Sequence, residues 1–237
     1  MNIRKLQLAI MAAGLAGAMA APSLFAYTGL DGVINFDPPT FQNGGGGEFN
    51  AIATGLGSFT TFCLEGQEFI DGPPSGPYTY TINTGAVAGG GGANAIDPHT
   101  GLTMDNISIG TAWLFSQFTA GTLTLDNGTG TYFDANRLAN AGELQNAIWF
   151  LEDEVGGQNN GYVALAETAL ASNLAGIQVD SNGAYGVVAL NLFGGGEPNT
   201  LAQDVLYAPV PEPTSVGCFL LGLGALVCSR RFRKGSV

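Results

Sequence analysis

Positive charge is scarce in this chain of 237 residues, which has 7 Lys and Arg residues against 19 Asp and Glu residues and a formal net charge of −12. Nucleic acids are bound mainly through clustered basic residues, so this composition excludes DNA and RNA as partners. The chain has one histidine, His99, and three cysteines, of which Cys218 and Cys228 lie in an apolar run near the C-terminus, so the remaining ligands are too few for a conventional structural zinc site. His99 lies in a turn-like segment without a nucleophile motif around it. We therefore predict a protein that is not an enzyme and has no cofactor.

The N-terminus has the pattern of a secretory signal peptide. Arg4 and Lys5 precede an apolar, Ala-rich stretch at 6–19, and Ala18-Met19-Ala20 is a small-x-small cleavage site. A second candidate cleavage site follows Ala26. We assign residues 1–26 to the signal peptide and exclude them from the fold.

The C-terminus combines a short motif, an apolar run and a basic end. The motif is Val210-Pro211-Glu212-Pro213, and the apolar run spans Val216 to Cys228, short of the ~20 residues that a permanent membrane span needs. The basic end should stay cytoplasmic and place the rest of the chain outside; it consists of Arg230, Arg231, Arg233 and Lys234. An ordinary C-terminal membrane anchor is the alternative interpretation.

This tail resembles the PEP-CTERM sorting signal of Gram-negative bacteria, in which a Pro-Glu-Pro motif, a short transmembrane helix and an Arg-rich end follow in this order. The resemblance covers residues 209–237. It implies a processing partner of the exosortase type, which cleaves near the motif and discards the tail after transient anchoring in the inner membrane. The mature protein would then reach the cell surface or the extracellular space.

Removing both ends leaves one domain, residues 27–208, with an unusual composition. It has 18 acidic residues and a single basic one, Arg137, so its formal charge is −17, and it has no lysine. Cys63 is its only cysteine, which excludes an internal disulfide. A single thiol in an exported protein suggests an intermolecular bond or another special role.

The pattern of this region predicts strands, then helices, then strands. Extended, aromatic and Thr-rich segments predict strands at 31–36, 58–64, 77–83, 184–193 and 203–207. Helical spacing predicts a helix capped by Asp105 or Asn106, a second over about 135–154 and a third over 163–174. Glycine runs, including Gly44–Gly47, predict flexible loops. The expected fold is β-rich α+β, a sandwich or barrel-like domain with a helical insertion.

Acidic side chains offer two weak candidates for calcium binding, the segments Glu152-Asp153-Glu154 and Asp126-Asn127-Gly128. Neither has EF-hand spacing, and successive helix residues point in different directions. A solvated helix end and a turn are the simpler interpretations, so we assign no metal site.

Two short motifs combine the lone thiol with a side-chain amide. Phe62-Cys63-Leu64 lies on a predicted strand, and Leu144-Gln145-Asn146-Ala147-Ile148-Trp149 lies on the second predicted helix. Gln145 shares a helix face with Ile148 and Trp149, at i+3 and i+4. This face is apolar and predicted to point inward, where a free amide needs a partner. A buried cysteine and a hydrogen-bonded core glutamine would be the simplest explanation.

The pair resembles the thioester domains of bacterial surface adhesins, where an aromatic-Cys-apolar motif is combined with an apolar-Gln-x-x-apolar motif. The resemblance implies an internal thioester between Cys63 and Gln145, formed with loss of ammonia, that an amine on a surface or matrix partner can open to form a stable amide. Such a bond needs shelter from water, for which Phe62, Trp113 and Trp149 are candidates.

Two classes of function are therefore open. The first is covalent attachment to an amine-bearing surface or matrix component. The second is a non-covalent structural or adhesive role in the extracellular matrix or biofilm, without a thioester.

Overall fold

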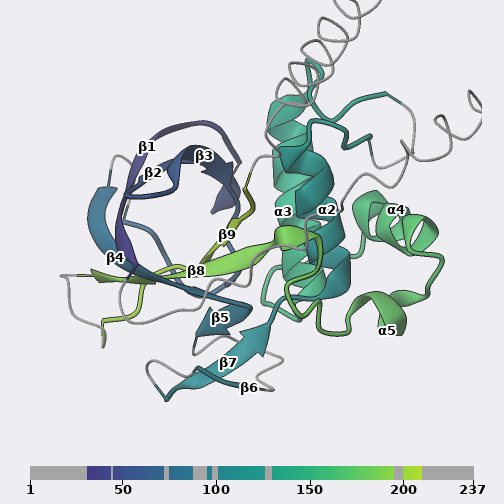
Figure 1. The fold of residues 1–237 in the computed structure, drawn as a ribbon. Helices are drawn as coiled ribbons and strands as arrows, with labels where there is room; N and C mark the ends of the chain where they lie inside the picture. Colours follow the sequence, from purple (N-terminus) through teal and green to yellow (C-terminus); the bar gives the residue numbers. More distant parts are fainter. Residues whose placement is uncertain are drawn as a thin grey trace, which may run out of the picture.

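A computed structural model describes residues 31–43, 45–71, 75–87, 95–97, 101–125, 130–194 and 200–209 (Figure 1). The predicted signal peptide, the sorting motif at 210–213, the apolar run and the basic end of the chain lie outside the described residues. So do His99 and the segment at 126–128. The predictions made for these segments are therefore unchanged by the structure.

Six strands form an antiparallel sheet that curves into a nearly closed barrel (Figure 1). Their order in the sheet is β3-β2-β1-β4-β8-β9. The strands are β1 (Gly32–Asn43), β2 (Gly46–Ala53), β3 (Gly57–Thr61), β4 (Ser75–Asn83), β8 (Val188–Phe193) and β9 (Val205–Tyr207). The first and last chain segments of the domain thus belong to one sheet.

The barrel closes through the residues that follow β3. Cys63 pairs with Val205 of β9 in an antiparallel bridge, and the backbone N–H of Leu206 donates to the carbonyl of Phe62 at 3.0 Å. Side chains alternate along an extended chain, so Phe62 and Leu64 lie in the core beneath the helices while Cys63 lies in the core of the barrel. Cys63 therefore occupies the boundary between two hydrophobic cores.

Four helices and a small sheet complete the part of the domain that the structure describes. The small sheet has the order β5-β7-β6 and is formed by β5 (Gly85–Val87), β6 (Ala95–Ile96) and β7 (Thr103–Asn106). The helices are α2 (Ile109–Thr119), α3 (Arg137–Leu151), α4 (Gly161–Ala169) and α5 (Leu174–Ile177), and a 3₁₀ turn at Ala184–Gly186 precedes β8. Helix α3 lies against β1 and β2, and α4 packs against α2 and α3. Figure 1 shows α2 and α3 beside the barrel, with α4 and α5 farther from it.

The predicted fold class is confirmed at the level of a β-rich, barrel-like domain with helices inserted between strands. Three predicted elements are longer than the observed ones, since β3 ends at Thr61, α4 ends at Ala169 and a 3₁₀ turn occupies Ala184–Gly186 before β8. Two further local predictions are wrong. Gly46 and Gly47 begin β2 and do not form a loop, because cross-strand pairing with Asn43 and Gln42 of β1 orders them. Ser108, and not Asp105 or Asn106, caps α2, accepting a hydrogen bond from the N–H of Thr111 at 3.2 Å.

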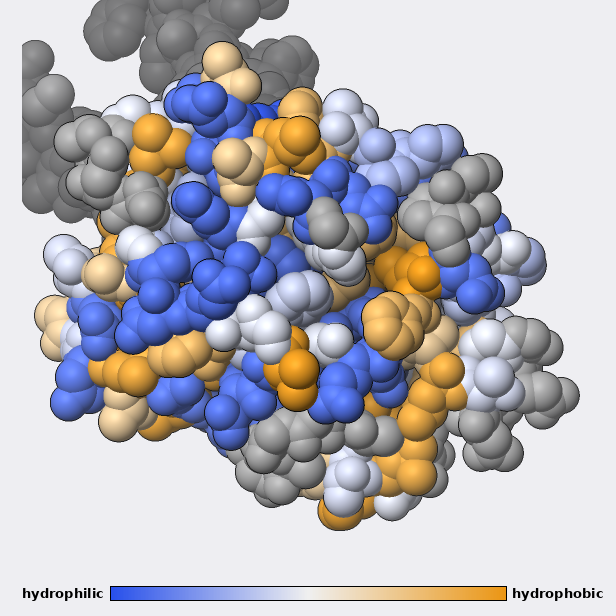
Figure 2. Space-filling view, turned by 180° about the vertical axis from the view of Figure 1, so that it is seen from behind, coloured by the Kyte–Doolittle hydropathy of each residue, from blue (hydrophilic) through white to orange (hydrophobic). Residues whose placement is uncertain are grey.

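The surface of the described residues is largely polar. On the face shown in Figure 2, hydrophilic residues predominate and hydrophobic ones form small separate groups. The exposed large hydrophobic residues come from different elements, with Phe69 the most exposed at 75%. Among the described residues, no helix is both long enough and apolar enough to cross a membrane.

Candidate functional site

The structure brings Cys63 and Gln145 together across 82 positions of sequence. The side-chain amide of Gln145 donates from Nε2 to the backbone carbonyl of Cys63 at 2.8 Å, and its Oε1 accepts from the backbone N–H of Cys63 at 3.1 Å. Both residues are buried, with exposed fractions of 2% for Cys63 and 1% for Gln145. The inward orientation predicted for Gln145 is confirmed, and its partner is the predicted cysteine residue.

The hydrogen bonds also determine which way the amide of Gln145 faces. A backbone carbonyl can only accept and a backbone N–H can only donate, so Nε2 must face the carbonyl of Cys63 and Oε1 the N–H groups. A second backbone N–H, that of Gly47, donates to Oε1 at 3.3 Å. The carbonyl oxygen of Gln145 therefore lies between two backbone donors, one from β2 and one from the segment that follows β3.

Glycine at the start of β2 permits this close approach. A Cβ atom at position 46 would lie 2.4 Å from Cγ of Gln145 and 3.0 Å from the ring of Trp149. Gly47 has a φ of +105°, a conformation that favours glycine. The Gly-rich segment thus lets α3 insert Gln145 between β2 and the segment that follows β3.

Burial controls the chemistry of the thiol. It raises the pKa of the Cys63 thiol far above its ordinary value, so the neutral thiol is the resting form. Because the thiolate is the nucleophile, the thiol must give up its proton as the sulfur attacks, and that proton can leave with the amide nitrogen as ammonia. The same burial keeps water away from an acyl–sulfur bond, once formed.

Only one of the three predicted shields lies at this site. Trp149 packs against the barrel core that includes Cys63, and its ring lies close to Gly46 beside Gln145. Phe62 points away, into the helical core, where its ring meets those of Phe115 and Phe118. Trp113 lies against α4 and lines a cavity there. The alternation of side chains around Cys63 explains why its neighbour Phe62 does not cover it.

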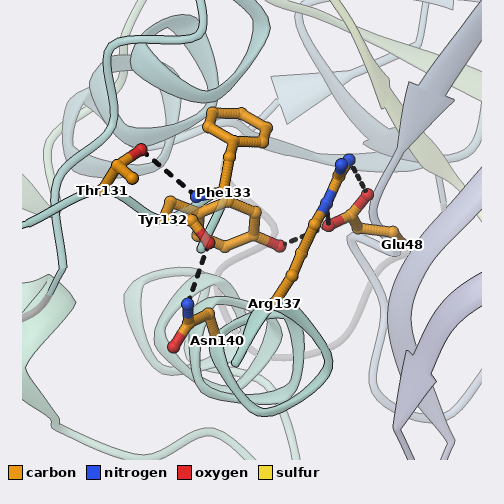
Figure 3. Close-up of polar contacts among 6 residues, drawn as sticks. All are labelled: Glu48, Thr131, Tyr132, Phe133, Arg137 and Asn140. Atoms are coloured by element: carbon orange, nitrogen blue, oxygen red, sulfur yellow. Dashed lines mark hydrogen bonds and ion pairs between the residues drawn. The ribbon is translucent and has the colours of Figure 1, made fainter. Parts of the chain in front are cut away.

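A charged cluster next to this site was not predicted from the sequence (Figure 3). Arg137 at the start of α3 donates from Nε and Nη2 to the two carboxylate oxygens of Glu48, at 2.8 and 2.6 Å. The hydroxyl of Tyr132 donates to Glu48 at 2.8 Å. The guanidinium also lies over the rings of Phe41 and Phe133. The sequence signal for this cluster was Arg137 itself, the single basic residue of the region.

The acidic segment considered for calcium does not converge on one point. Glu152 accepts from the N–H and the hydroxyl of Ser108, whereas Glu154 accepts from the N–H of Gly66 at 3.0 Å. Asp153 is exposed between them. Among the described residues, no group of three or more His, Cys, Asp or Glu side chains is arranged to hold a metal ion.

Comparison with protein-family models, with curated proteins and with solved structures finds no significant match for this chain. The functional interpretation therefore depends on the sequence motifs and on the geometry of the site.

Proposed function

We propose that the protein is exported, sorted through its PEP-CTERM-like tail and then attached covalently to an amine-bearing surface or matrix component through a thioester between Cys63 and Gln145. The observation that carries the proposal is the docking of the Gln145 amide on the backbone of the only cysteine in the mature region. These two hydrogen bonds hold the side-chain amide of Gln145 beside the residue whose thiol is proposed to attack it.

The proposed reaction has two steps. In the first, the sulfur of Cys63 bonds to Cδ of Gln145, the C–N bond breaks, and the amide nitrogen leaves as ammonia with the thiol proton. In the second, the nitrogen of a primary amine bonds to Cδ, the C–S bond breaks, and the sulfur takes up a proton. The product is an N-substituted Gln145 and a free Cys63. The protein acts once, by nucleophilic acyl transfer without turnover.

The absence of lysine supports this chemistry. An electrophile on a lysine-bearing surface could be captured by its own chain or by an identical neighbour. The region 27–208 has no lysine side chain, so its N-terminus is its one amine. Side-chain amines for the second step must therefore come from a different molecule.

The first test is the mass of the exported protein, produced from the full chain. We expect the wild type to be lighter by one ammonia than its sequence requires, and Cys63→Ala and Gln145→Ala each to have the full mass of their own sequences. The exposed amide variant Gln178→Ala is the matched control and should show the same loss as the wild type. Methylamine should add its mass to the wild type and release one titratable thiol.

A wild type that keeps its ammonia and has a freely titratable thiol after denaturation would exclude the thioester. The non-covalent structural or adhesive role would then be the better account of the protein.

The second test concerns the sorting tail. Converting Pro211, Glu212 and Pro213 to alanine is expected to leave the chain anchored in the inner membrane, because the processing enzyme would no longer recognise the motif. Fractionation of cells and medium measures this release. Undiminished release of the triple variant would contradict the proposed sorting route and would leave the thioester proposal untouched.

A further inference from the structure

The carbonyl oxygen of Gln145 has the surroundings of an oxyanion pocket. Two backbone N–H groups, of Cys63 and Gly47, point at Oε1 from 3.1 and 3.3 Å. Both steps of the proposed acyl transfer pass through a tetrahedral carbon whose oxygen carries negative charge. Donors held at that oxygen before reaction stabilise the charge, and loss of one such donor costs about 10²–10³ in rate in enzymes.

The two donors are held in different ways. The N–H of Cys63 belongs to the segment that closes the barrel, where pairing with Val205 positions it. The N–H of Gly47 lies near the end of the β1–β2 hairpin, where Gln42 and Asn43 are paired with Gly47 and Gly46. This hairpin end is buried and paired within the sheet, but that pairing does not by itself fix β2 relative to α3, which carries Gln145.

Arg137 constrains β2 at Glu48, the residue that follows Gly47. The register of β1 and β2 pairs Phe41 with Glu48, next to the pair of Gln42 with Gly47. Arg137 contacts both members of the first pair: it binds Glu48 through two hydrogen bonds and its guanidinium lies 4.5 Å from the centre of the Phe41 ring. Arg137 and Gln145 belong to the same helix, α3. The ion pair thus joins the helix that carries the reacting carbonyl to the strand that carries the donor.

We propose that Arg137 and Glu48 are positioning residues for the acyl-transfer site: their ion pair holds β2 against α3 so that the Gly47 N–H completes a two-donor oxyanion pocket with the Cys63 N–H. This inference rests on the proposed thioester. It gives a function to the only basic residue of the mature region. Tyr132 also helps to hold the ion pair in place, because its hydroxyl donates a hydrogen bond to the same carboxylate of Glu48.

The test uses two conservative variants of the exported protein, Arg137→Lys and Glu48→Gln. Lysine keeps the charge but cannot bind both carboxylate oxygens as a planar fork, and glutamine keeps the shape without the charge. We expect a thioester that opens about tenfold to a hundredfold more slowly with methylamine than the wild type, since misplacement by ~1 Å can cost 10²-fold. The infrared stretch of the thioester carbonyl should move to higher frequency as the second donor is lost.

The control for general destabilisation is Asn173→Ala. This variant removes the side-chain cap of α5, a helix that does not contribute to the Cys63–Gln145 site. It should change neither the carbonyl stretch nor the rate with methylamine. A merely structural role of the ion pair would leave the carbonyl stretch of the Arg137→Lys and Glu48→Gln variants at the wild-type value, which would overturn the inference while the thioester stood.

A further measurement does not need the thioester. In the Cys63→Ala background Gln145 keeps its amide, and hydrogen exchange of the Gly47 N–H reports whether it is still bound. We expect faster exchange at Gly47 when Arg137→Lys is added, and unchanged exchange when Asn173→Ala is added. Equal exchange with and without Arg137→Lys would refute the positioning role. A wild-type protein whose mass shows no loss of ammonia would instead contradict the proposed thioester. The two N–H donors would then have no role in acyl transfer.

Discussion

The Gly46→Ala variant is expected to lose the proposed thioester between Cys63 and Gln145, whereas Gly45→Ala is expected to keep it. The two glycines are neighbours, Gly45 just before β2 and Gly46 its first residue, but they differ in their surroundings. A Cβ at Gly46 would lie 2.4 Å from Cγ of Gln145, well inside the 3.5–4.0 Å of ordinary carbon contacts. A Cβ at Gly45 would have no atom within 4 Å.

The added methyl group at position 46 must displace Gln145, because Cγ is in the middle of that side chain and cannot move alone. Trp149 blocks a second direction, at 3.0 Å from the same Cβ. The displacement separates the Gln145 carbonyl from Cys63 and from its two donors. With a shift of about 1 Å, we expect thioester formation to fall by about 10²-fold or more.

Intact mass and thiol titration measure this result, and circular dichroism shows whether the variants are folded. A folded Gly46→Ala protein that still lacks one ammonia would contradict the inferred packing of α3 on β2. Loss of the thioester in Gly45→Ala as well would indicate a general sensitivity of the hairpin, and not a contact specific to Gly46.

The domain is expected to become more stable as pH falls from about 8 to about 5. Burial raises the pKa of Glu152 from 4.5 to about 7, and hydrogen bonds from Ser108 and the nearby charge of Asp105 are smaller influences. The pKa of Glu68 is raised to about 7, first by burial and then by Glu154, and burial raises that of Asp204 as well. These three carboxyl groups therefore bind a proton more tightly in the folded state than in the unfolded state.

The sign follows from proton linkage. Between pH 4.5 and 7 the folded state binds more protons at Glu152 than the unfolded state does, so the free energy of unfolding falls as pH rises through this window. The shift of Glu152 corresponds to at most about 3 kcal/mol over the full window. The mutual repulsion of the surface carboxylates also weakens as pH falls, which stabilises the folded state in the same direction. A variant is therefore needed to isolate the contribution of Glu152.

Glu152→Gln should flatten the dependence of the unfolding midpoint on pH, because the amide cannot ionise yet can accept from Ser108. Glu143→Gln, at an exposed position of α3, is the matched control and should keep the wild-type slope. Chemical unfolding between pH 5 and 8 measures both. A midpoint that is highest at pH 8, or equal slopes for the two variants, would contradict the role of Glu152.

The elements that carry the site were largely predictable from local pattern. The strand predicted at 58–64 corresponds to β3, which ends at Thr61, and the helix predicted over about 135–154 corresponds to α3, as the aromatic and Thr-rich stretch and the helical spacing of Leu144, Ile148 and Leu151 indicate. The position of Gln145 on the buried face followed from the same spacing. Local patterns succeed here because strand and helix periodicity depend on neighbours within a few residues.

Strand β2 was missed because its first residues belong to a glycine run, which has low intrinsic strand preference. The partners of β2 on both sides, β1 and β3, order it through cross-strand pairing. Asp105 does not cap α2, because it belongs to β7 and pairs with Ala86. In both cases tertiary pairing overrode a local preference.

By itself, the amino-acid sequence determined the acidic, lysine-free composition of residues 27–208 and indicated the candidate export and sorting ends and Cys63 and Gln145 as a candidate reactive pair. Only the tertiary structure decided that Gln145 reaches Cys63, that Gly47 adds a second donor, and that Arg137 is bound by Glu48. These contacts join residues 82 to 98 positions apart. Their formation depends on the closure of the barrel and the docking of α3, which no local periodicity encodes.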